Sequence, residues 1–82
     1  MGLFSPSPSK VVDRFKKLYP DLPTLKKIRE TQKERYVQIG SQLRDLVTDS
    51  AEALKDLKLS DGQIDDLVKV IKTCRRYREL FY

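Results

Sequence analysis

The chemistry-bearing side chains of this chain concentrate in its last eleven residues, Lys72 to Tyr82. The segment KTCRRYRELFY carries a lysine, three arginines, three aromatic residues and the only cysteine. A thiolate can act as a nucleophile, and arginines interleaved with aromatic rings can bind the phosphates and bases of nucleic acid. The first question is whether these side chains face a ligand or only complete a packed helix.

Helical spacing favours packing for the cysteine and the aromatic rings. An apolar seam recurs every three or four residues along a predicted helix at 61–81, and it consists of Leu67, Val70, Cys74, Tyr77 and Phe81. Cys74 then reads as a small core residue rather than a reactive thiol. Tyr77 and Phe81 are expected to pack against the rest of the chain rather than stack on bases.

Two groups of cations lie on helix surfaces and could contact phosphates. One lies opposite the seam and consists of Lys69, Lys72 and Arg76. The other flanks the apolar side of the preceding helix and consists of Lys26, Arg29 and Lys33. Each group falls within about 60° on a helical wheel. An ordinary solvated helix face explains the same charges, and acidic residues are interleaved among them.

The residues needed for catalysis or for holding a cofactor are missing. The chain has no histidine, and histidine is the side chain that titrates near neutral pH without perturbation. The sequence contains no P-loop, dinucleotide-binding fingerprint, metal-ligand spacing or nucleophile elbow. We therefore predict a protein that is not an enzyme, with no cofactor, no metal site and no catalytic residue.

Size and charge point to a small domain that gains stability from a partner. A chain of 82 residues with net charge +5 buries only about 60% of its unfolded surface when it folds alone. The positive excess lies in residues 1–40, which hold nine Lys/Arg and four Asp/Glu. A lone cysteine fits the cytoplasm or another reducing intracellular compartment. No apolar run approaches the roughly 18–20 residues that span a bilayer.

A flexible Ser/Pro arm at 1–9 is expected to precede two helical segments. The first covers 10–19, with Ser9 as its N-cap, and Pro20 and Pro23 end it. The second covers 22–58, with a bend expected near residue 40 or 49. One apolar stripe with a period near 3.6 residues runs along it, made of Leu25, Ile28, Tyr36, Ile39, Leu43, Leu46, Val47, Leu54 and Leu57.

The start of the third helix, at 61–81, carries the clearest local signal. Ser60 and Gln63 match a capping box, and Leu59 and Ile64 match a hydrophobic staple. The connection from the second helix is short, so the two helices should fold back on each other. The predicted fold class is all-α: an antiparallel helical hairpin with a short preceding N-terminal helix, forming a small three-helix bundle over 10–82.

The N-terminal part of the second helix extends beyond the reach of the third helix. Either the first helix folds over this overhang, or Leu25 and Ile28 stay exposed until a partner covers them. Arginines border this end, and an interface tolerates arginine better than a core does. The predicted partner-binding residues are Leu25, Ile28, Arg29, Arg35, Tyr36, Tyr77 and Phe81.

Three functions compete. The preferred one is a helical protein–protein interaction module, such as an adaptor, small chaperone, regulatory subunit or assembly factor, that binds another chain or itself. The alternative is a nucleic-acid-binding protein that contacts phosphates through the two cation groups, although Asp61, Asp65 and Asp66 would repel DNA. The third is a peripheral binder of anionic membranes, with Leu3, Phe4 and the first helix as its apolar contact.

Overall fold

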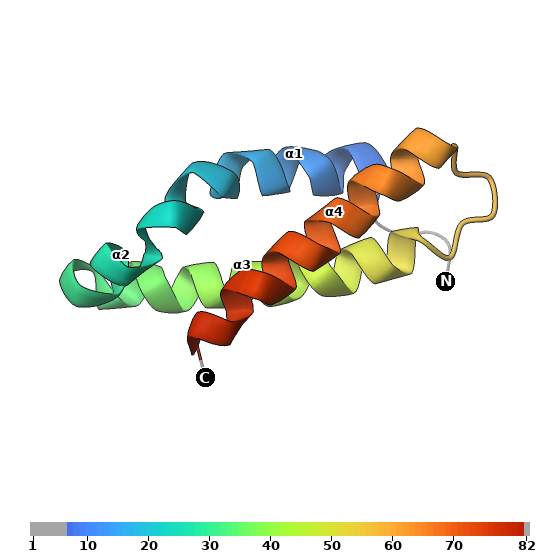
Figure 1. Ribbon diagram of the computed structural model, residues 1–82. Helices are drawn as coiled ribbons and strands as arrows, with labels where there is room; N and C mark the ends of the chain where they lie inside the picture. The colour runs from blue at the N-terminus through green and yellow to red at the C-terminus, as the bar shows by residue number, and fades with distance from the viewer. Residues whose placement is uncertain (1–6, 82) are drawn as a thin grey trace.

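The computed structural model describes residues 7–81, which are almost entirely helical (Figure 1). The α-helices are α1 (Pro8–Leu18), α2 (Leu25–Thr31), α3 (Lys33–Ala53) and α4 (Asp61–Arg78). A 3₁₀ segment, η2 (Tyr19–Thr24), joins α1 to α2, and another, η3 (Glu79–Phe81), extends α4. These residues contain no β-strand, which confirms the all-α class.

Three helices, α1, α3 and α4, form the bundle, and α3 is the longest with 21 residues. α1 and α4 both run antiparallel to α3, and α2 folds over the N-terminal end of α3 (Figure 1). Each of α1, α3 and α4 contacts the other two. The body measures 43 Å by 24 Å by 21 Å. The predicted hairpin of two antiparallel helices is therefore present, with a short helix packed against it.

Local sequence signals set where the first and last helices begin. The Ser60 Oγ accepts a hydrogen bond from the backbone N–H of Gln63 at 3.2 Å, and the Gln63 Oε1 accepts one from the backbone N–H of Ser60 at 2.9 Å. This capping box starts α4 at Asp61, as the sequence predicts. α1 begins at Pro8, two residues before the predicted start, with Ser7 rather than Ser9 as N-cap. Proline is favoured in the first turn of a helix.

The prediction of one helix over 22–58 is wrong. The chain breaks at Gln32, whose backbone angles (φ −139°, ψ 72°) are not helical, and α3 runs through residues 40 and 49 as one helix. The break lets α2 turn back onto α3. Leu25 and Ile28 become buried as a result, with 1% and 7% of their surfaces exposed. Neither predicted arrangement of the overhang is present: the first helix does not cover it, and instead α2 folds back onto α3 and buries Leu25 and Ile28.

Along α3, the buried core residues follow the predicted apolar stripe until the helix ends at Ala53. Its members are Val11, Leu18, Leu22, Leu25, Ile28, Ile39, Leu43, Leu46, Ala53, Leu67, Val70 and Cys74. Leu57, predicted on the same stripe, is 99% exposed because α3 ends at Ala53 and the chain then turns toward α4. Ser50 and Ala53 are buried instead. The Ser50 Oγ has no hydrogen-bond partner within residues 7–81.

Candidate interaction surface

Antiparallel packing gathers positive charge toward one end of the molecule. Residues 17–44 and 69–81, here called the basic half, hold 12 Lys/Arg and 4 Asp/Glu, a net charge of +8. Residues 45–68, the acidic half, hold 2 Lys/Arg and 7 Asp/Glu, a net charge of −5, and residues 7–16, which pack beside them, add a net charge of +2. The start of α3 lies beside the end of α4 (Figure 1), so segments far apart in sequence add their charges in space.

Three side chains from three elements form a layer on the basic half. The rings of Tyr36 on α3 and Phe81 on η3 stack with centroids 4.1 Å apart and planes 21° apart. The Tyr36 Oη donates a hydrogen bond to the carbonyl oxygen of Leu80 at 2.6 Å. The Arg29 guanidinium lies over the Tyr36 ring, 5.9 Å from its centroid, in range for a cation–π contact. We call Arg29, Tyr36 and Phe81 the aromatic layer.

Gly40 makes the aromatic layer possible. It lies one helical turn after Tyr36 on α3, and a Cβ built at this position would be 2.8 Å from Phe81 Cε1. Real Cβ atoms do not approach other carbons so closely, so only glycine lets the Phe81 ring lie against the α3 backbone. The sequence predicts only a bend near residue 40. The spacing of residues within one helix carries no signal for this contact.

The structure separates the predicted partner-binding residues into distinct groups. Arg29, Tyr36 and Phe81 come together, with Arg29 exposed and the two rings partly buried against the core. Leu25 and Ile28 do not belong to that surface, because α2 buries them against α3. Tyr77 is partly buried and packs against the core, as the spacing along α4 predicts.

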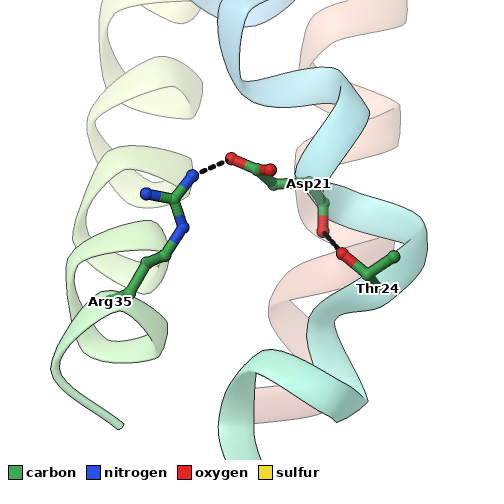
Figure 2. Close-up of polar contacts among 3 residues, drawn as sticks. All are labelled: Asp21, Thr24 and Arg35. Carbon is green, nitrogen blue, oxygen red and sulfur yellow. Dashed lines mark hydrogen bonds and ion pairs between the residues drawn. The ribbon is translucent and has the colours of Figure 1, made fainter. Parts of the chain in front are cut away.

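Arg35 lies away from the aromatic layer and fastens η2 to α3. Figure 2 shows its Nη2 donating to the Asp21 carboxylate, while the Thr24 Oγ1 donates to the Asp21 carbonyl oxygen at 3.0 Å. A second ion pair, between Arg14 and Asp49 at 2.6 Å, ties α1 to α3. Both pairs face solvent, so each contributes about 0–1 kcal/mol to stability. Arg35 therefore braces the fold instead of lying free for a partner.

A cleft of about 320 Å³ lies between the α1–η2 segment and α3, and both ion pairs border it. Leu18, Ile39 and Leu46 contribute apolar surface, and Lys17, Gln38, Gln42 and Asp45 contribute polar groups. The charges around the cleft are of both signs. They select no ligand class.

The six predicted phosphate-binding residues are all exposed. Within residues 7–81, none of them forms an ion pair, and the only interaction of their charged groups is that of Arg29 with Tyr36. They come from α2, α3 and α4. The residues concerned are Lys26, Arg29, Lys33, Lys69, Lys72 and Arg76.

Cys74 is fully buried on the α3-facing side of α4, which confirms it as a small core residue. Burial raises the pKa of its thiol from 9.0 to about 11, and the nearby positive charge of Arg78 opposes that rise. The thiol stays protonated at neutral pH. It is therefore a poor nucleophile in the folded protein.

The Cys74 thiol should make stability fall between pH 9 and pH 11. Below pH 9 the thiol is neutral in both states. Above it the unfolded chain ionises while the folded chain resists until about pH 11, so rising pH favours unfolding by about 1.4 kcal/mol per unit. Urea unfolding of wild type and Cys74→Ala across this range measures the effect. The difference between the two curves isolates the thiol from tyrosine and lysine titration, and parallel curves would contradict the assignment.

The apolar side of α1 is used inside the molecule. Val11 is buried and Phe15 packs against the core, so α1 does not offer the membrane contact that the third hypothesis needs. Leu3 and Phe4 lie outside the described residues. No helix within 7–81 is long and apolar enough to cross a bilayer. The same residues contain no cluster of His, Cys, Asp or Glu that could hold a metal ion.

Comparison of the chain with known protein families, curated proteins and solved structures finds no match. A function must therefore be argued from the geometry of the chain alone.

Proposed function

We propose that this chain is a non-enzymatic helical interaction module that binds an acidic surface of another protein through its basic half. The observation that carries the proposal is the aromatic layer of Arg29, Tyr36 and Phe81, set within a half of net charge +8. Tyr, Phe and Arg are the residues enriched at protein interfaces. An adaptor, regulatory subunit or assembly factor would use such a surface.

Charge should determine how fast and how selectively this surface binds. A positive half steers an acidic partner into contact, and the acidic half repels the same partner from the opposite end. The rings of the aromatic layer are held in place by the Leu80 hydrogen bond and by Gly40. Little side-chain entropy is then lost when the partner arrives.

Nucleic-acid binding is the second candidate, and the six exposed cations without ion pairs favour it. Two features count against it. The Tyr36 ring already stacks on Phe81 and lies under Arg29, so it does not offer bases a free platform. A long polyanion laid along the 43 Å body would also meet the acidic half, whose net charge is −5.

Affinity capture from an extract of the native source, with and without nuclease, tests the proposal. We expect a discrete protein that survives nuclease and whose purified form binds more weakly as salt rises. Lys26→Glu with Lys33→Glu should reduce its affinity at least about tenfold. Lys10→Glu with Lys58→Glu, an equal change of net charge outside the basic half, should leave affinity nearly unchanged.

Two outcomes would overturn the proposal. Recovery that collapses with nuclease would mean that the cations bind phosphates. Equal affinity of the two double variants for the captured protein would mean that the basic half is not the binding surface.

A further inference from the structure

α4 carries a second apolar stripe that the fold covers only in part. Ile64, Val68 and Ile71 recur at i, i+4 and i+7 on this helix. Ile64 is 38% exposed, and Val68 and Ile71 are partly exposed. None of the three belongs to the buried cluster or to the partly buried side chains that pack against it. Their spacing alone would predict that they widen the core seam of α4.

The position of this stripe around the helix explains its exposure. At 100° per residue, its centre lies about 100° from the mean direction of the buried residues Leu67, Val70 and Cys74. Asp66, which faces α1 across a surface depression, lies on the other side of the buried residues. The stripe therefore points away from α1, and each of its three side chains is partly exposed to solvent.

Charged residues flank one side of the stripe, and their sign changes along the helix. Asp61 and Asp65 occupy the first half of this flank, and Lys72 and Arg76 occupy the second half. All four are exposed, and none forms an ion pair within residues 7–81. The flank is thus acidic at one end and basic at the other, and these four charged side chains form no ion pair within residues 7–81 of a single copy.

We propose that the α4 stripe is a self-association surface on which α4 of a second copy packs antiparallel. A two-fold axis near Val68 puts Ile64 of one copy against Ile71 of the other. Because a two-fold axis brings the same flank of both helices together, Asp65 then faces Lys72 of the second copy, and Asp61 faces its Arg76. Each contact occurs twice, so the surface is self-complementary and closed.

The charge pattern selects both the occupant and its direction. In a parallel pair, a two-fold axis along the helices would bring this flank against the other side of the partner's stripe, so the four charges would not meet one another. Antiparallel pairing also lays the basic half of one copy, of net charge +8, beside the acidic half of the other, of net charge −5. α4 is 18 residues long, or about 27 Å. One such helix offers less than the roughly 800 Å² per partner of a standard interface, so the dimer should be concentration-dependent.

Sedimentation equilibrium of the full chain from about 10 µM to about 1 mM tests the inference. The mass should rise from 9.6 kDa towards twice that value. Val68→Glu should hold it at the monomer value, while Val37→Glu, at an exposed valine on α3, should dimerise as wild type does. Circular dichroism would verify that both variants fold.

A charge exchange gives a sharper test, because it distinguishes the antiparallel pairing from any other use of the stripe. Asp65→Lys alone and Lys72→Asp alone should each weaken dimerisation about tenfold or more, since every copy then meets like charges twice. Mixing the two variants should restore dimers, because both contacts become complementary again. A chain that stays monomeric at about 1 mM, or a mixture that gains nothing over its components, would overturn the inference. Neither result bears on partner capture by the basic half.

Discussion

Replacing Ile28 with aspartate should unfold the isolated chain or bring it close to unfolding. Ile28 lies on α2 with 7% of its surface exposed, so the change removes a buried side chain and puts a carboxyl group in its place. Losing the apolar contacts costs about 2–5 kcal/mol, and the buried carboxyl adds to that loss. A small domain has about 5–15 kcal/mol of stability in total. Thermal and urea unfolding followed by circular dichroism measure the effect.

Lys27→Asp is the matched control for Ile28→Asp. Lys27 precedes Ile28 on the same short helix and is exposed, so the same residue is introduced without entering the core. We expect a loss of less than about 0.5–1 kcal/mol, typical of a surface site. If Ile28→Asp were as stable as Lys27→Asp, α2 would not be packed on α3. Ile28 would then be free for a partner, as the rejected alternative requires.

The contrast between Ser60 and Gln32 shows which helix boundaries a sequence can predict. The start of α4 depends on two hydrogen bonds between residues three positions apart, and the residue types alone predict them. No proline or glycine lies at or beside Gln32, so the sequence does not predict the break. The break forms because burying Leu25 and Ile28 stabilises the fold by more free energy than interrupting the helix costs. Such long-range packing overrides local propensity.

The aromatic layer could be predicted only in part. The spacing along α4 indicated that Phe81 packs, and the stripe on α3 included Tyr36. Their pairing depends on the register of two antiparallel helices and on the bare backbone at Gly40, 41 residues before Phe81. The charge asymmetry has the same origin. Residues 61–81 include three aspartates at one end and three arginines at the other, and only the folded hairpin sorts them into an acidic and a basic half.

Leu43→Ala should be among the most destabilising conservative changes in this chain, and Leu57→Ala among the mildest. The sequence put both leucines on one apolar stripe, so periodicity alone predicts similar losses. In the structure Leu43 lies on α3 and is 0% exposed, whereas Leu57 lies beyond the end of α3 and is 99% exposed. Leucine-to-alanine changes in a core cost about 2–5 kcal/mol because the removed methyl groups leave a cavity. An exposed leucine leaves none.

Urea unfolding of the two variants compares the same chemical change at a buried and an exposed site. We expect the urea midpoint of Leu43→Ala to fall well below that of wild type, and the free energy of unfolding of Leu57→Ala to stay within about 0.5 kcal/mol of wild type. Because the proposed dimer would itself stabilise the fold, both must be measured at low protein concentration. Equal losses would mean that α3 continues to Leu57 and carries the stripe with it. If α3 ends at Ala53, we expect a large difference in the free energy of unfolding between the two variants. Leu57 then continues the apolar period in sequence but lies beyond the helix and packs on nothing.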